Sequence, residues 1–343
     1  MATTATAFSP KEFKVLYKFQ SEFGTPASGT NMYQLDVDSI SMPSLNPNQT
    51  LDIKTSDGRT AKTIDMMKEN YGRLLSVKEM TFTGTFHLDT AHKLPLYNIL
   101  NQSTSSDAIN LVSGFQPNAL SDASGSLGSH ELFTIVIARP LSSNTGGALE
   151  NKAKNLEFTD CVCTNYQISA DSTTDGGLYK FSMTFSTGSI YSDFDDATDV
   201  TATAYANSTV VTMGKINAGS LKVFNANHIL SSFNVTVDHP AIWTGAGGAG
   251  FITCNRGQEA SVTFDAQVKY DELGDEHIQS FDTGAVHDNV GLYIENSDNF
   301  DISVNDYIIT NAALAEGDIM MLDLSGKAID DGTEALLTLD WTS

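Results

Sequence analysis

The sequence has few cysteines and no long apolar run. Its 3 cysteines among 343 residues are too few, and odd in number, for a disulfide framework, which fits a reducing compartment. No apolar run approaches the roughly 20 residues of a membrane-spanning helix, and FTIVIA at 133–138 suits one buried strand. The start, MATTATAFSPKEF, lacks the basic and apolar regions of a secretory signal. We therefore expect synthesis in a cytoplasm and no membrane partner.

Positive charge is also scarce. The chain holds 19 Lys and Arg against 42 Asp and Glu, a net charge of −23, and residues 191–343 hold only 5 bases against 24 acids. A surface this acidic repels the phosphate backbone, which excludes a protein that grips nucleic acid tightly. The same repulsion suits a surface past which nucleic acid must slide.

Composition and the alternation of polar and apolar residues indicate β-strands. Abundant Ser, Thr, Asn and Gly favour a mostly β protein with polar loops. Alternating apolar residues predict strands at 13–19 and 32–44, although SPKE at 9–12 resembles a helix start. A hairpin is expected from 155–169 and 177–189.

Residues 43–75 form a long polar segment without clear periodicity. Connections longer than about 12–15 residues are uncommon in compact domains and usually have a function. SDGR at 56–59 suits the tip of an extended hairpin. We therefore expect this segment to be a functional loop.

The segment VKEMTFTGTFHLDTAHKLPLYNIL at 77–100 predicts a strand followed by a helix. The apolar face of the strand would hold Met80, Phe82, Phe86 and Leu88, and its polar face Thr81, Thr83, Thr85 and His87. Thr90 is the expected helix cap. Pro95 is tolerable only in the first turn of that helix.

This strand pattern recurs in the second half of the chain. Residues 257–281 again alternate before a possible short helix, and their polar positions are Ser261, Thr263, Asp265 and Gln267. The strand at 33–38 has an echo at 233–238. The echoes predict a duplication, with one domain at 1–195, a linker at 196–219 and a second domain at 220–343.

No motif predicts catalysis or a bound metal. GAGGAG at 245–250 follows a proline and precedes a β-like segment, which favours a plain turn over a dinucleotide site. Cys161 and Cys163 could hold a metal, but no nearby ligands join them, and buried strand cysteines are the better interpretation. The acidic segments 270–277 and 296–301 lack the spacing of an EF-hand. We therefore expect no enzyme activity, no cofactor and no metal site.

Three segments resemble the tail tube (major tail) proteins of long-tailed bacteriophages. They are KVLYKFQSEFGTPASG, YQLDVDSISMPS with the polar loop after it, and KEMTFTGTFHLDTAHKLPLYNIL. The resemblance covers roughly residues 11–190 and consists of a pattern of elements and short phrases. Beyond residue 200 only the internal echo extends it.

The resemblance implies a β-sandwich or partial barrel with a flanking helix. Subunits of that family join their sheets into rings lined by a continuous β-barrel, and stacked rings form the tube that conducts the genome. With a duplicated domain, three copies would form a pseudo-hexameric ring. The candidate ring-wall or lumen residues are Thr81, Thr83, Thr85, His87, Ser261, Thr263, Asp265 and Gln267. The candidate inter-ring residues of the 43–75 loop are Asp52, Lys54, Asp57, Arg59 and Lys62.

The implied partners are further copies of the chain, the tape measure, terminator and distal tail proteins, and double-stranded DNA in transit. The implied location is the virion tail. Three alternatives stay open: a hexameric ring whose second half is an outward decoration domain, such as an immunoglobulin-like module; a β-rich surface adhesin or pilus-like protein; and a β-sandwich enzyme.

Overall fold

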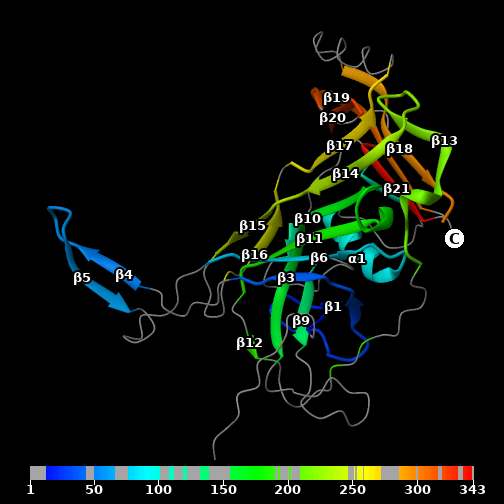
Figure 1. Ribbon diagram of the computed structural model, residues 1–343. Helices are drawn as coiled ribbons and strands as arrows, with labels where there is room; N and C mark the ends of the chain where they lie inside the picture. Colours follow the sequence, from blue (N-terminus) through cyan, green and yellow to red (C-terminus); the bar gives the residue numbers. More distant parts are fainter. Residues whose placement is uncertain are drawn as a thin grey trace, which may run out of the picture.

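The computed structural model describes residues 13–43, 50–65, 76–100, 108–111, 119–121, 132–138, 155–189, 192–193, 200, 202, 209–245, 251, 253–257, 259–271, 286–298, 300–315, 319–330 and 335–341. Within these residues the chain is mostly β, as expected, and its single α-helix is α1 (Thr90–Ile99) (Figure 1). The GAGGAG segment beyond Gly245, most of 270–277 and the possible second helix near 278–281 lie outside the described residues.

The strands before residue 194 are β1 (Lys14–Phe19), β2 (Tyr33–Leu35), β3 (Ser39–Ser41), β4 (Thr50–Lys54), β5 (Thr60–Asp65), β6 (Lys78–Thr85), β7 (Ala108–Leu111), β8 (Ala119–Ser121), β9 (Phe133–Ala138), β10 (Leu156–Asp171), β11 (Lys180–Thr187) and β12 (Ser192–Asp193). The later strands are β13 (Ile216–Val223), β14 (Leu230–Asp238), β15 (Ala241–Thr244), β16 (Thr253–Arg256), β17 (Ser261–Lys269), β18 (Val286–Asn296), β19 (Phe300–Ala315), β20 (Met321–Ala328) and β21 (Leu337–Trp341).

One large antiparallel sheet contains strands from both halves of the chain. Its main path runs β13-β18-β19-β20-β17-β14-β10-β11-β6-β3. The halves meet where β10 pairs with β14, from Asn165 opposite Asp238 to Asp171 opposite Ser232. In the described part of the chain this path is open at both ends, and no closed barrel is found.

The same series of strand pairings occurs in each half. In the first half β1, β9, β10, β11, β6 and β3 pair in that order. In the second half β13, β18, β19, β20, β17 and β14 do the same.

Irregularities in the two longest strands match as well. Both β10 and β19 have 16 residues. Asp160 in β10 and Asp306 in β19 have positive φ, 54° and 47°. Four residues later, each strand has a register shift at a threonine followed by asparagine, Thr164 in β10 and Thr310 in β19. Bulges of this kind bend a strand and allow it to change partners.

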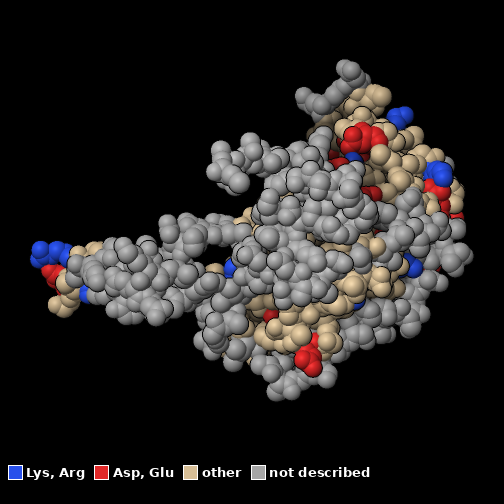
Figure 2. All heavy atoms as spheres, turned by 90° about the horizontal axis from the view of Figure 1, so that it is seen from below, with Lys and Arg blue, Asp and Glu red and all other residues tan. Residues whose placement is uncertain are grey.

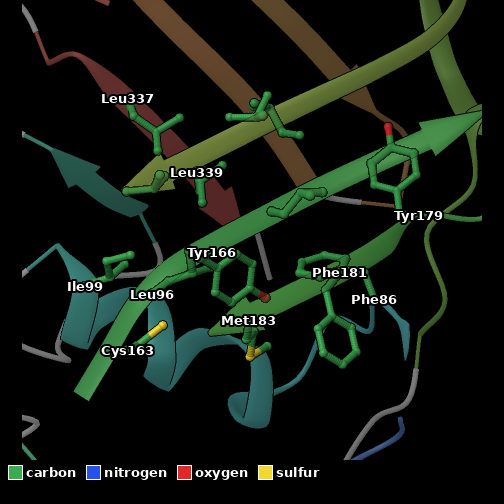
Figure 3. Close-up of a cluster of buried hydrophobic side chains, with 14 of the residues drawn as sticks. Phe86, Leu96, Ile99, Cys163, Tyr166, Tyr179, Phe181, Met183, Leu337 and Leu339 are labelled. Atoms are coloured by element: carbon green, nitrogen blue, oxygen red, sulfur yellow. The ribbon is translucent and has the colours of Figure 1, made fainter. Parts of the chain in front are cut away.

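Each long strand changes partners near its aspartate. The first part of β10 pairs with β9, and its second part lies between β11 and β14. The first part of β19 pairs with β18, and its second part pairs with β20. The main hydrophobic cluster takes side chains from both halves. Figure 3 shows part of it, where Leu337 and Leu339 of β21 lie near Tyr166 of β10 and the end of α1.

Helix α1 differs from expectation at two residues. Asp89 caps it instead of Thr90, and its side chain accepts a hydrogen bond from the His92 N–H at 3.1 Å. Pro95 lies in the interior of the helix and not in its first turn. A proline there leaves the carbonyl one turn earlier without its helical donor. That carbonyl belongs to Ala91, and the buried Tyr17 hydroxyl donates to it instead.

The expected strand over 32–44 is interrupted. It forms β2 and β3, with Asp36–Asp38 between them outside either strand. The linking backbone passes so close to β6 that a Cβ added at Gly84 would lie 2.2 Å from the Asp36 carbonyl oxygen. Only glycine permits this approach, and the close passage coincides with the break.

The segment expected as a linker contacts the body wherever it is described. Val200 and Val211 are buried, Ala202 bridges to Met32, and β13 begins at Ile216. The predicted domain boundaries stay a prediction. The hairpin expected around 56–59 is confirmed: β4 and β5 pair and stand apart from the main body (Figure 1).

A buried arginine joins the end of α1 to the junction of the halves. The Arg256 guanidinium donates to the carbonyls of Cys163, His239 and Asn98 at 2.7, 2.9 and 2.7 Å, and to the Asn98 side chain at 2.8 Å. Burial lowers the pKa of Arg256 to about 10, which leaves it protonated at neutral pH. A positive charge near the last carbonyls of a helix is favourable. His239 Nδ1 also lies 2.8 Å from the Ile99 carbonyl oxygen.

We predict that Arg256→Met lowers the free energy of unfolding by about 2–4 kcal/mol, because buried carbonyl groups lose a charged donor. Chemical denaturation of the purified protein measures this loss. Arg59→Met is the matched control: its side chain is 86% exposed, and we expect a change within about 0.5 kcal/mol. Equal stability of the two variants would contradict the structural role of Arg256.

Candidate functional site

The polar residues of β6 and β17 lie on one continuous face of the large sheet. Thr83 and Thr263 belong to a single cross-strand row that crosses seven strands. In order from β20 to β3 the row contains Lys327, Thr263, Thr236, Gln167, Ser182, Thr83 and Ser39. Two parallel rows connect Thr81 with Ser261 and Thr85 with Asp265. Six of the eight candidate wall residues therefore form three matched pairs within one chain.

Hydrogen bonds between neighbouring strands connect the side chains of this face. Thr81 lies 2.9 Å from the Thr184 hydroxyl, and Thr83 lies 2.7 Å from the Ser39 hydroxyl. Further bonds join Asn165 to Asp238 at 2.6 Å, Asn234 to Asp265 at 3.3 Å, and Gln267 to Asp323 at 2.8 Å. The Asn165–Asp238 bond crosses the junction of the halves. Cross-strand polar pairs of this kind stabilise a sheet by tenths of a kcal/mol each, roughly 0.2–1.

The face is polar but carries little net charge. Most of its side chains are hydroxyls and amides. Its charged residues in the three rows and the positions next to them are Glu79, Asp171, Asp238, Asp265, Asp323, Lys180, Lys269 and Lys327. Lys180 also lies 3.2 Å from Asp38 beside β3.

His87 is the candidate that differs from the others. It is only 9% exposed, although its neighbours on the predicted polar face are more accessible. Its Nε2 lies 3.7 Å from Asp36, and its ring stacks against His92 with centroids 6.0 Å apart. His87 therefore belongs to a buried polar cluster at the start of α1.

Two groups of this cluster have shifted pKa values. Burial raises the pKa of the Asp89 carboxyl to about 7, although the N–H groups of His92 and Ala91 donate to it, and the charge of Asp36 raises it further. Burial lowers the pKa of His92 to about 3, and the nearby His87 contributes. Both groups are held towards their neutral forms by the surrounding core.

The candidate inter-ring residues lie on the projecting hairpin. Asp52 belongs to β4 and Lys62 to β5. At the turn, the Arg59 Nε donates to Asp57 at 2.6 Å, and Gly58 has a φ of 82°. Hydrogen bonds from the Thr55 side chain and from Arg59 lower the pKa of Asp57. Figure 2 shows charged side chains of both signs at the far end of this projection.

Cys161, Cys163 and Cys254 are all buried and unpaired with one another, and burial raises the pKa of Cys163 and Cys254 to about 12. No cluster of His, Cys, Asp or Glu among the described residues could hold a metal ion. No helix in the described ranges is long and apolar enough to cross a membrane. Comparison of the chain with protein-family models and with curated proteins finds no match.

The sequence led us to expect only part of this face. β20 is not among the expected strands, although Leu322 and Leu324 alternate with Asp323 and Ser325. That alternation is the usual signal of a half-buried strand. The contributions of β10, β11 and β14 follow from strands that were expected, but their position between β6 and β17 follows only from the sheet order.

We predict that the free energy of unfolding of Asp89→Asn increases relative to that of the native chain as the pH rises from about 4 to 7. The raised pKa means that the folded chain holds a proton that the unfolded chain releases, so native stability falls through this range and levels off above it. The upper limit is roughly 4 kcal/mol, since one pH unit corresponds to about 1.4 kcal/mol. Asparagine keeps the helix cap.

Denaturation of both proteins at several pH values measures the difference. Asp57→Asn serves as the control. The pKa of Asp57 is lowered, so its contribution to stability changes with pH only below about pH 4, outside the tested range. A difference between Asp89→Asn and the native chain that stays constant from pH 4 to 7 would show that Asp89 is not buried as described.

Proposed function

We propose that this protein is a structural subunit of a phage tail tube, without enzyme activity, and that its polar sheet face lines the passage for DNA. The observation that carries the proposal is the continuous polar face shared by β6 and β17 across the junction. A wall of hydroxyls and amides offers double-stranded DNA few charged contacts, and tight DNA binding depends on such contacts. The resemblance of residues 11–190 to tail tube proteins supports the same function.

We also propose that the two halves are a duplication of one tail-tube domain. The repeated order of pairings and the matched irregularities of β10 and β19 support this. An outward decoration domain would not be expected to continue the sheet of the first half, so the sheet order favours two equivalent domains over that alternative.

The number of strands supports a ring of three copies. Each chain supplies eight strands to the polar face, from β19 to β3 along the path. Three copies would supply 24, and a barrel of that size is roughly 45 Å across between strand backbones. This leaves room for a double helix, whereas six copies would double the diameter.

We expect the purified protein to form rings or tubes with threefold subunit symmetry in negative-stain electron microscopy. Lateral contacts would close the ring, and head-to-tail contacts along the axis would extend it. A chain that stays monomeric across protein concentration and salt would contradict the proposal and favour the adhesin alternative. Rings of six subunits would contradict the copy number only.

The projecting hairpin β4–β5 is proposed as the contact between rings. Replacing residues 51–64 with a short Gly-Ser linker should leave a folded protein, because the hairpin pairs only with itself in the described structure. We expect this variant to form single rings and no tubes in electron microscopy. The unaltered chain, imaged under the same conditions, is the control. Tubes of normal length from the shortened chain would refute this role.

A further inference from the structure

Two strand segments at the ends of the polar face lack a partner on one side. β3 pairs with β6, and residues 311–315 of β19 pair with β20; in the described structure neither pairs with a second strand. The equivalent segment of β10 is flanked on both sides, by β11 and β14. An unpaired strand edge is a template for another strand.

Exposure of one apolar side chain marks the vacant side of β19. Ile168 lies four residues after the bulged Thr164, and Leu314 lies four residues after the bulged Thr310. Ile168 pairs with Val235 of β14 and is 2% exposed. Leu314, which has no strand on that side, is 46% exposed. The end of β19 thus has the composition of an inner strand in the position of an edge strand.

Two corresponding rows define how a partner strand would align. The first row contains Asn165, Thr184, Thr81 and Ser41. The second row contains Asn311, Ser325, Asp265 and Asn234. Each row begins at the asparagine after the bulged threonine and ends on the last strand of its half. These starting points make Ser41 the counterpart of Asn234.

The β10–β14 ladder inside the chain shows which residue of β19 would lie opposite Ser41. Asn234 of β14 lies opposite Ser169, which is four residues beyond Asn165 in β10. The corresponding residue in β19, four beyond Asn311, is Ala315. We propose that residues 41–43 of one copy, the end of β3 and the two residues after it, pair antiparallel with residues 313–315 of β19 in a second copy, with Ser41 opposite Ala315. This inference rests on the proposed function, since it describes the seam between copies in the ring.

The stagger at this seam agrees with the geometry of closed barrels. The rows advance by four residues along the strand for every four strands crossed. With about 3.3 Å per residue and about 4.8 Å between strands, the strands tilt by roughly 35°. Closed barrels need tilts of about 35–45°. A seam without stagger would leave only the stagger of the internal junctions, which gives a tilt of roughly 19°, outside that range.

The test is a disulfide cross-link in the full chain. Residues directly opposite in antiparallel strands have Cα atoms about 4.5–5.5 Å apart, within disulfide reach. We expect the double variant Ser41→Cys, Ala315→Cys to form covalent multimers up to the trimer after mild oxidation, seen on non-reducing gels. The pair Ser169→Cys, Asn234→Cys is the matched positive control and should cross-link within one chain.

A second pair tests the register. In Ser41→Cys, Asn311→Cys the partner is displaced by about 13 Å along the strand, so we expect at least tenfold fewer multimers. Tubes that form without the Ser41–Ala315 cross-link, or that cross-link better through position 311, overturn the seam and leave the proposed function standing. A chain that gives the internal control but neither tubes nor multimers overturns both.

An additional variant removes dependence on cysteine chemistry. Leu314→Asp should leave the melting temperature of the single chain unchanged, because the side chain is half exposed there. It should abolish rings, because the seam would bury a charge. Ala313→Ser is the control on the same strand and should assemble. Normal rings from Leu314→Asp would overturn the seam.

Discussion

The antiparallel ladder between β10 and β14 is the interaction on which the rest of the structure depends. It pairs seven consecutive residues of the first half with seven of the second. A slip of one residue in such a ladder would turn every polar side chain towards the core. Its register therefore decides that the polar faces of the two halves are continuous and that their apolar faces share one core.

The ladder is anchored at one end by buried polar contacts. Arg256 binds the carbonyls of Cys163 at the start of the ladder and of His239 just after β14, and it also binds the last turn of α1. One side chain thus connects the first half, the second half and the helix. Satisfying several carbonyls with a single cation is effective in a site from which water is excluded, because unpaired buried groups are costly.

Alternating polarity made several strands predictable. β6, β14 and β17 each bury every second side chain, and the sequence shows this directly. The turn at 56–59 was predictable from its residues alone. The polar residues of the candidate wall could be assigned to strands in this way, but their alignment into shared rows could not. That alignment depends on pairing between strands separated by dozens of residues.

Packing between distant residues explains the other differences from expectation. Phe181 lies opposite Gly84, and Phe264 lies opposite Gly326, where an added Cβ would meet the phenyl ring at 2.3 Å. Pro95 is accommodated inside α1 because Tyr17, 74 residues away, donates to the Ala91 carbonyl. His87 turns into the core because Asp36 and His92 lie beside it. Apart from His92, which is five residues from His87, none of these partners is near in sequence, and no local pattern identifies them.

The junction inside the chain changes the energetics of the assembly that we propose. In a ring built from single domains, every contact between neighbouring sheets is an association between separate molecules, which costs translational and rotational freedom. In a ring of three duplicated chains, half of the contacts are ladders like that between β10 and β14, formed during folding. Linked domains meet at a high effective concentration, so these contacts do not weaken on dilution. The duplicated chain also has fewer unpaired edges per strand. It has two edges for eight strands, whereas a single-domain chain would have two edges for four. Fewer exposed edges reduce wrong pairing before the ring closes, which is the physical advantage of joining two such domains in one chain.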